Sequence, residues 1–332
     1  MKRTILAAAL ALAFAASASA QDSKVRIVQQ FGLSYLPLHV ALEHKLIEKH
    51  AAAAGVQNPA VEVSRLASGA AANDALISGS VDLAMAGLTV LMNLWDKTQG
   101  SNPVRGMMAI ADSPIYFNTV DPRIKSIKDL GPDDRVAMTA GKGTQHAIVL
   151  QMAAAKEFGW DKREKLDSLA VSMSHPDGVV GLLTGGGAFK THATTVPFIQ
   201  MELADPRVRT ILKSYDVTGG RQTLIVAYTT EKWRKENPKM YAATYAALKE
   251  GMERIKADTK AAAELYMKVE KPKLSVDTIH GILKDENMLL FTPTPSKVMA
   301  FAEHMNKVGL MKNKMAGWKD AFFDNIHALP GN

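Results

Sequence analysis

Residues 64–89 constrain the fold more than any other part of the chain, because they combine a strand end, a turn, a short helix and a second strand. Alternating apolar and polar residues from Val61 to Ser64 predict the first strand. Ser68 and Gly69 then predict the cap of a helix over 70–77, and a strand is expected at 83–86. The free N–H groups and helix dipole at such a helix start bind a small anion or a carbonyl oxygen. This stretch is therefore a candidate ligand site.

Strand and helix patterns alternate through the N-terminal third of the chain. Strands are predicted at 24–31, 60–66, 83–86 and 106–110, and helices at 37–55, at 70–77 and from about residue 90. Pro37 suits the first turn of a helix. Helices of this length between strands imply crossover connections and a largely parallel sheet. In such sheets ligands bind beyond the carboxyl ends of the strands.

A second block repeats this pattern. It predicts a strand at 135–139, a helix at 144–158, a strand at 169–173, a helix capped near Pro176 and Asp177, a glycine turn and a strand at 188–191. The sequence at 76–79 resembles that at 182–185, which suggests two similar half-sites. Leucine followed by glycine also ends many unrelated helices, so this similarity has a second explanation.

The C-terminal part contains one more predicted strand, at 222–229, and then mostly helices, of which 238–258 is the longest. Helices without a sheet of their own are expected to return to the first lobe. The predicted domains are therefore a signal peptide at 1–20, a discontinuous lobe 1 at 21–115 and 218–332, and a lobe 2 at 116–217. The two crossings, near 112–120 and 215–220, are predicted to act as a hinge.

The N-terminus has the features of a secretory signal peptide. Lys2 and Arg3 precede an apolar run at 5–16, and small residues at 18–20 predict cleavage after Ala20. An exported protein is expected. Cleavage would leave 38 basic and 33 acidic residues, so the net charge would fall from +7 to +5. This mild charge without clustered basic residues argues against nucleic-acid binding. The absence of cysteine excludes disulfides and thiolate metal sites.

Several segments together resemble one family of proteins. They are 31–46 with its Pro37, ASGAAANDALISGSVDLAMAG, SIKDLGPDDRVAMTAGKGTQH, the HPDG element, ENPKMYAATYAALKEG and GWKDAFFDNIHALPG. In their order and spacing they resemble the nitrate, sulfonate and taurine type of ABC-importer substrate-binding proteins, whose relatives bind thiamine-precursor pyrimidines or aromatic carboxylates. The resemblance implies an α/β protein with the type II periplasmic binding protein fold, in which two lobes with mixed, mostly parallel sheets close on a solute. It also implies a monomer that delivers the solute to an ABC permease.

The resemblance places five segments at the cleft, and each follows or ends a predicted strand. Their residues are Ser34 and Tyr35; Ser68, Gly69 and Ala70; Gly87 and Thr89; Gly143, Thr144, Gln145 and His146; and His192 and Thr194. Ser68 also fits an ordinary helix cap, and a lone histidine such as His192 also fits a structural role. An anionic solute would need a basic group, for which the candidates are Lys142, Arg221 and His192.

The predicted solute is a sulfonate, nitrate, an aromatic or aliphatic carboxylate, or a related small heterocycle. Two other classes stay open. One is an enzyme similar to the pyrimidine-precursor synthases of the same fold group, which would need a cofactor lysine in the cleft. The other is a periplasmic sensor or adaptor, which would show an apolar patch. His39, His44 and His50 do not share one helix face, so we expect no zinc site, and we expect no cofactor.

Overall fold

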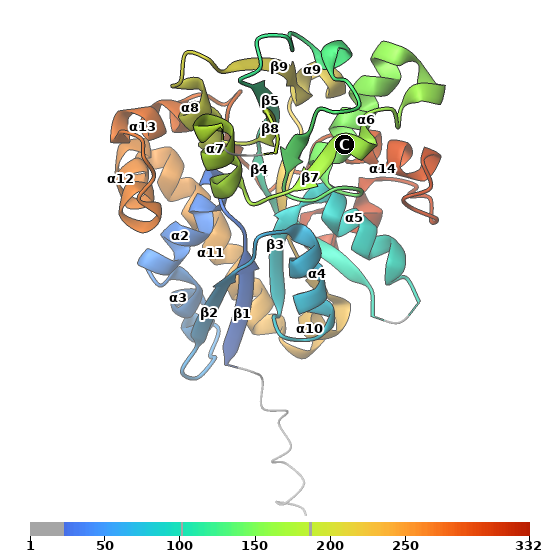
Figure 1. The fold of residues 1–332 in the computed structure, drawn as a ribbon. Coiled ribbons are helices and arrows are strands. Elements are labelled where there is room, and N and C mark those ends of the chain that lie inside the picture. Colours follow the sequence, from blue (N-terminus) through green and yellow to red (C-terminus); the bar gives the residue numbers. More distant parts are fainter. Residues whose placement is uncertain (1–22, 101, 186–187) are drawn as a thin grey trace, which may run out of the picture.

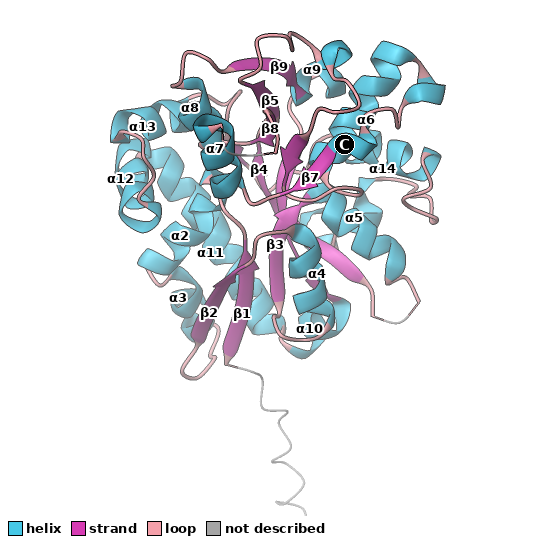
Figure 2. Cartoon of the chain, viewed as in Figure 1, coloured by secondary structure: helices cyan, strands magenta, loops and turns pink. Residues whose placement is uncertain are grey.

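The chain folds into two α/β lobes, and a computed structural model describes residues 23–100, 102–185 and 188–332 (Figure 1). Strands run through the middle of the molecule and helices flank them (Figure 2). The predicted signal peptide at 1–20 lies outside the described residues.

The sheet of lobe 1 has six strands in the order β11-β4-β10-β3-β1-β2. They are β1 (Lys24–Gln29), β2 (Ala60–Arg65), β3 (Leu83–Gly87), β4 (Val104–Asp112), β10 (Thr223–Thr230) and β11 (Leu290–Phe291). β1 pairs in parallel with β2 and β3, whereas β10 lies antiparallel between β3 and β4. The first four strands therefore share one direction, and the segment that returns from lobe 2 runs against them. β11 was not predicted from the sequence.

The sheet of lobe 2 has five strands in the order β7-β6-β8-β5-β9. They are β5 (Tyr116–Thr119), β6 (Val136–Met138), β7 (Ala170–Ser172), β8 (Thr191–Thr194) and β9 (Arg209–Lys213). β6 pairs in parallel with β7 and β8, and β5 lies antiparallel between β8 and β9. Both sheets are thus mixed, with most strands in one direction.

Helices cover both sheets. Lobe 1 carries α2 (Leu36–Glu43), α3 (Leu46–Ala53), α4 (Gly69–Ile77), α5 (Leu88–Lys97), α10 (Glu231–Glu236), α11 (Pro238–Ala257), α12 (Thr259–Glu270), α13 (Val276–Lys284) and α14 (Val298–Lys307). Lobe 2 carries α6 (Gln145–Phe158), α7 (His175–Thr184), α8 (Phe198–Leu203) and α9 (Ser214–Thr218). Short 3-10 helices are η1 (Leu33–Tyr35), η2 (Ile127–Asp129), η3 (Trp160–Lys162), η4 (Asp167–Leu169), η5 (Trp318–Ala321) and η6 (Asp324–Ile326).

The two lobes repeat one connection pattern. In lobe 1 the chain runs from β1 through α2 and α3 to β2, and through α4 to β3; in lobe 2 it runs from β6 through α6 to β7, and through α7 to β8. In both, the first strand lies between the other two. Gly79 and Gly185 follow α4 and α7 with φ of 73° and 69°, which is the left-handed conformation that ends many helices. The predicted glycine turn continues into 186–187, which lie outside the described residues.

The two crossings between the lobes lie side by side. Ile115 and Ser214 exchange hydrogen bonds, because Ile115 N donates to Ser214 Oγ and Ser214 N donates to the Ile115 carbonyl, each at 2.9 Å. At the lobe 1 end of the crossings, Thr223 Oγ1 donates to Asp112 Oδ1 at 2.8 Å. These bonds join the first predicted crossing, 112–120, to residues that flank the second, 215–220.

The C-terminal helices return to lobe 1, as expected. The longest, α11, packs on α2 and α3 (Figure 1). Gly251 permits this contact, because a Cβ at that position would lie 2.6 Å from the Pro37 carbonyl oxygen. In contrast, α14 contacts both α5 and α6 and so touches both lobes.

Three local predictions were wrong. The helix expected over 37–55 is interrupted, because Lys45 has a φ of 48° and separates α2 from α3. The cap of α7 is Ser174, whose hydroxyl accepts a hydrogen bond from Asp177 N, rather than Pro176 and Asp177 themselves. The strand expected at 188–191 is β8 at 191–194, because its register is set by pairing with β5.

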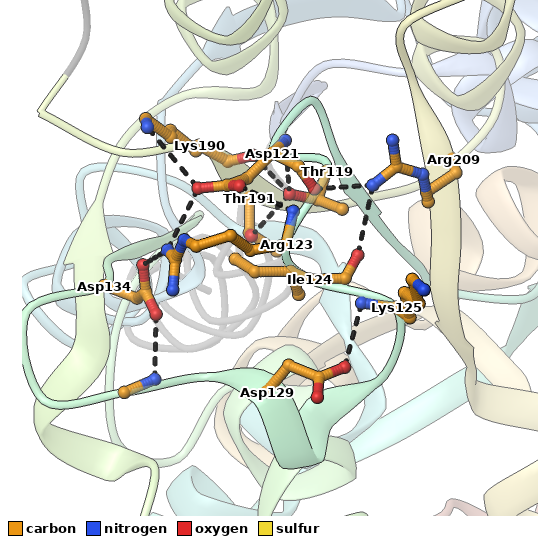
Figure 3. Close-up of polar contacts among 11 residues, drawn as sticks. Thr119, Asp121, Arg123, Ile124, Lys125, Asp129, Asp134, Lys190, Thr191 and Arg209 are labelled. Carbon is orange, nitrogen blue, oxygen red and sulfur yellow. Dashed lines mark hydrogen bonds and ion pairs between the residues drawn. The ribbon is translucent and has the colours of Figure 1, made fainter.

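A cluster of charged side chains in lobe 2 links the segments around Asp121, Lys190 and Arg209 (Figure 3). Asp121 accepts hydrogen bonds from the backbone and side chain of Arg123, and it forms an ion pair with Lys190. Arg123 also contacts Asp134, and Arg209 Nη1 donates to the Asp121 carbonyl. Since this cluster connects β8 and β9 with the segment that follows β5, its role is to hold the end of the sheet.

Candidate functional site

A small cavity lies where the carboxyl ends of the strands of both lobes meet. The space open to the centre of a water molecule is about 50 Å³. One water needs roughly 10–15 Å³ on this measure, so the cavity has room for a small multi-atom guest. Lobe 1 contributes Gln30, Phe31, Ser34, Tyr35, Ala67, Gly69, Gly87, Val90, Leu224 and Ile225, and lobe 2 contributes Thr139, Thr144, Gln145, His146, His175 and Thr195.

Parallel strands position most of these residues. Gln30 follows β1, Ala67 follows β2 and Gly87 ends β3 in lobe 1. In lobe 2, Thr139 follows β6 and Thr195 follows β8. The repeated connection pattern thus brings equivalent strand ends of both lobes to one place, as expected for ligand sites on open α/β sheets.

Three helices begin at the cavity. Ser68 caps α4 by accepting from Ala71 N, Thr144 caps α6 by accepting from Ala147 N, and Ser174 caps α7. Gly69, Gln145 and His175 are the first residues of these helices, and all three line the cavity. The positive ends of three helix dipoles therefore favour a partial negative charge on a guest.

Some polar atoms of the cavity wall are buried without a partner. Among the described residues, Ser34 Oγ, Gln145 Oε1 and His146 Nε2 make no hydrogen bond. Their side chains belong to residues that are only 3%, 2% and 7% exposed. Because a buried unpaired polar atom costs about 1–3 kcal/mol, a hydrogen-bonding guest at this cavity would gain free energy by pairing with these three atoms.

The two imidazoles of the wall are uncharged at neutral pH. Burial, with a smaller effect of the neighbouring His192, lowers the pKa of His146 to about 3. Burial, followed by the effects of His146 and His192, lowers the pKa of His175 well below its usual value. A neutral imidazole has one donor and one acceptor nitrogen, so each ring offers directional hydrogen bonding without charge.

Lobe 1 supplies an aromatic wall. The Tyr35 hydroxyl donates to Gln30 Oε1 at 3.3 Å, and burial raises the pKa of Tyr35. The Arg65 guanidinium lies 5.0 Å from the centroid of the Phe31 ring and also forms an ion pair with Glu270. Arg65 therefore supports Phe31 from outside, and none of the residues that line the cavity carries a formal charge at neutral pH.

Of the residues predicted from the sequence, those that line the cavity are Ser34, Tyr35, Gly69, Gly87, Thr144, Gln145 and His146. The others lie close by in supporting positions. Ser68 caps α4, and Ala70 lines an open groove beside the cavity. Thr89 Oγ1 donates to the Gly143 carbonyl at 3.0 Å and so joins the two lobes.

His192 and Thr194 are not among the residues that line the cavity; both belong to β8 and are fully buried. His192 contacts Glu202 and His175, whereas Thr194 Oγ1 has no partner among the described residues. The two other basic candidates also lie outside the cavity. Lys142 is on the rim of the open groove, and Arg221 forms an exposed ion pair with Glu286.

Sequence reasoning missed other residues that line the cavity, namely Gln30, Phe31, Ala67, Val90, Thr139, His175, Thr195, Leu224 and Ile225. For some of them the sequence did carry a signal that could have predicted their place at the cavity. Gln30, Ala67, Thr139 and Thr195 lie just after strands, and His175 opens the HPDG element on which the family resemblance partly rests. Leu224 and Ile225 come from the returning strand β10, and their placement depends on tertiary structure.

Among the described residues, no three or more His, Cys, Asp or Glu side chains are grouped so that they could hold a metal ion. No described helix combines the length and apolar character needed to cross a bilayer.

No protein-family model and no curated protein matches the chain. Solved structures do match. The alkanesulfonate-binding protein SsuA from Xanthomonas axonopodis pv. citri, bound to MOPS, is 16% identical with a TM-score of 0.67, over 88% of this chain and 95% of that one. The periplasmic nitrate-binding protein NrtA from Synechocystis PCC 6803 is 17% identical with a TM-score of 0.68, over 90% and 84%. The aliphatic sulphonate-binding protein SsuA from Escherichia coli is 17% identical with a TM-score of 0.64, over 91% and 92%. The chain therefore has the periplasmic binding protein fold.

Proposed function

We propose that the protein is the extracytoplasmic solute-binding component of an ABC importer. It captures a small molecule between its lobes and delivers it to a membrane permease. The observation that carries this proposal is the cavity with unpaired polar atoms on both walls, Ser34 Oγ on lobe 1 and Gln145 Oε1 and His146 Nε2 on lobe 2. A guest that pairs with atoms of both lobes stabilises their closed arrangement.

The hydrogen bonds between the crossings support a hinge at 112–120 and 215–220, with lobe 1 at 21–115 and 218–332 and lobe 2 at 116–217. Two further bonds join the lobes next to the cavity. Leu33 N donates to the Val196 carbonyl at 3.1 Å, and Gln145 Nε2 donates to the Thr223 carbonyl at 2.9 Å. The Leu33–Val196 bond needs the cavity walls to be close together and therefore belongs to the closed state, whereas the Gln145–Thr223 bond lies at the lobe 1 end of the crossings.

The synthase alternative has less support. It needs a lysine at the cavity for its cofactor, and the described lining residues include none. A periplasmic location, cleavage after Ala20, a monomeric state and a permease partner remain parts of the proposal that rest on the sequence and on the shared fold.

A thermal-shift screen of the mature protein tests the proposal. The compounds are nitrate, sulfonates, carboxylates, amides and small heterocycles. A true solute at a hundredfold excess over its Kd stabilises the folded state by about 2.7 kcal/mol, and the transition rises accordingly. If no compound raises the transition and none binds in calorimetry, solute transport loses its support and a sensory or adaptor role gains.

A further inference from the structure

The lobe 2 wall of the cavity presents a fixed hydrogen-bond acceptor. Gln145 Nε2 donates to the Thr223 carbonyl at 2.9 Å, and only the nitrogen of an amide can donate. The remaining atom, Oε1, is therefore an acceptor, and it is buried without a partner in a residue that lines the cavity. A guest that offers no N–H or O–H group would leave this atom unpaired.

Three buried side chains form a hydrogen-bonded series that ends at the same wall. Glu202 Oε1 contacts His192 Nδ1 at 2.5 Å, and His192 Nε2 contacts His175 Nδ1 at 3.3 Å. Glu202 and His192 are fully buried, and His175 lines the cavity. The only ring nitrogen left at the end of the chain is His175 Nε2, which has no protein partner among the described residues.

The neighbours of Glu202 determine which atoms donate and which accept along this series of side chains. Thr210 Oγ1 donates to Asn118 Oδ1 at 2.8 Å, and Asn118 Nδ2 donates to Glu202 Oε2 at 2.9 Å. With one carboxylate oxygen occupied by Asn118, the other accepts the Nδ1 proton of His192. In the singly protonated form of His192, Nε2 is bare and accepts the Nδ1 proton of His175, which leaves His175 Nε2 as an acceptor.

Packing holds the rings in this order. A Cβ at Gly178 of α7 would lie 2.5 Å from the His192 ring, so only glycine permits the ring to lie against the helix. The His175 ring stacks on Phe198 with centroids 5.3 Å apart. The glycine of the HPDG element thus has a specific role, which is to admit His192 beside His175.

We propose that Glu202 and His192 are positioning residues that fix the tautomer of His175, so that the cavity selects an uncharged solute with N–H or O–H donors over an oxyanion. This inference rests on the proposed function and names its solute class. Two acceptors, Gln145 Oε1 and His175 Nε2, demand donors, whereas Ser34 and the helix starts can receive a carbonyl-type oxygen. A neutral group that combines both, such as an amide, satisfies the two walls together.

The histidine tautomers test this relay, meaning the hydrogen bonds that link Glu202, His192 and His175, without any solute. In a ¹⁵N-histidine-labelled protein at pH 7.5, long-range ¹H–¹⁵N spectra should show His175 and His192 with the proton on Nδ1 and a bare Nε2. The assignment uses His175→Gln and His192→Gln. A protonated Nε2 on His175 in the wild-type protein would overturn the proposal, and this measurement requires no stable Glu202 variant.

Glu202→Gln should reverse the direction of hydrogen-bond donation along the series Glu202, His192 and His175. Asn118 can only donate to the amide oxygen of the new side chain, so the amide nitrogen must face His192 Nδ1 and donate to it. His192 then donates from Nε2 to His175 Nδ1, and His175 carries its proton on Nε2. The matched control is Glu157→Gln, since Glu157 is also in lobe 2 but pairs with Lys128. An unchanged His175 tautomer in Glu202→Gln contradicts the relay.

Matched probes test the solute class. Acetamide and benzamide carry donors, whereas acetate and benzoate of the same shape carry none. We expect each amide to bind the wild-type protein roughly tenfold or more tightly than its carboxylate, because the carboxylate leaves buried acceptors unpaired. In Glu202→Gln this preference should fall by about three- to tenfold, and in Glu157→Gln it should not change.

Equal or tighter binding of the carboxylates by the wild-type protein rejects the solute class. If neither probe class nor any compound of the thermal-shift screen binds, the proposed function itself fails. The tautomer spectra still decide the relay in that case, so the two failures are distinguishable.

Discussion

Thr89 Oγ1 donates a hydrogen bond of 3.0 Å to the Gly143 carbonyl, and this bond joins the start of α5 in lobe 1 to the loop before α6 in lobe 2. Thr89 is fully buried, and a Cβ at Gly143 would lie 2.5 Å from Asn93 Nδ2. The two lobes therefore meet closely beside the cavity. The sequence predicted both residues as solute contacts, and their bond leads us to predict instead that they stabilise the closed arrangement of the lobes.

Thr89→Val removes this bond but keeps the shape of the side chain. We expect solute affinity to fall by roughly two- to tenfold, because the closed state loses one hydrogen bond of about 0.5–1.5 kcal/mol. Small-angle X-ray scattering should show a larger radius of gyration without solute. Thr98→Val is the control, since Thr98 Oγ1 donates within lobe 1 to the Leu94 carbonyl. An equal expansion in both variants would contradict the interlobe role.

Ser34→Ala tests whether the unpaired hydroxyl serves a guest. Ser34 Oγ has no partner among the described residues, so its removal should leave the free energy of unfolding unchanged or slightly higher. Affinity for the solute found in the screen should fall by about two- to tenfold in calorimetry. Ser214→Ala is the contrasting variant, because Ser214 Oγ accepts from Ile115 N and its loss should destabilise the protein. A strong loss of stability in Ser34→Ala would assign that hydroxyl to the fold.

The buried histidines predict how stability depends on pH. Burial lowers the pKa of His146 to about 3 and that of His39 and His304 to about 4, with smaller effects of His192 on His146, of Arg65 on His39, and of Arg163 and Lys307 on His304. The unfolded chain takes up these protons near pH 6.5, whereas the folded protein does not. Stability is therefore full above about pH 6.5 and falls as the pH drops towards 4.

Each such histidine contributes up to about 1.4 kcal/mol per pH unit to this slope. His146→Phe removes one titrating group, so urea unfolding between pH 6 and 4.5 should show a shallower decline for this variant. A slope identical to that of the wild-type protein would show that His146 is protonated in the folded state.

Two helical glycines should respond in opposite ways to alanine. A Cβ at Gly281 of α13 meets nothing within 4 Å, so Gly281→Ala should raise the free energy of unfolding by roughly 0.5–1 kcal/mol. Gly178→Ala should lower it instead, because the new methyl group collides with the His192 ring. Chemical denaturation measures both variants, and stabilisation by Gly178→Ala would contradict the packing of His192 on α7.

Replacement of Thr144 or His192, both predicted from the sequence as solute contacts, should affect folding as well as binding. Thr144 caps α6, so Thr144→Ala should cost about 0.5–2 kcal/mol of stability in addition to its effect at the cavity. His192→Ala should destabilise more, since it leaves buried Glu202 with one partner fewer. Thr144→Ser keeps the cap and is the matched control. A melting point of His192→Ala equal to that of the wild-type protein would reject its structural role.

The sequence alone determined most helices and the parallel strands, because helix caps and strand ends are local features, whereas β5, β9 and β11 were not predicted from it. Ser68 and Thr144 cap helices where hydroxyl residues precede apolar periodic segments, and the loops after parallel strands must lie at one edge of a sheet. Gly69 could therefore be placed at a ligand site from local features, whereas Ser34 and Gln145 were placed there by the family resemblance.

Only the tertiary structure decided which polar residues line the cavity and which pair with each other. The pairing of β8 with β5 buried His192 against Glu202, and the return of β10 brought Leu224 and Ile225 to the cavity. These contacts join residues far apart in the chain. Their free energy depends on burial and hydrogen-bond geometry, which no local pattern of residues encodes.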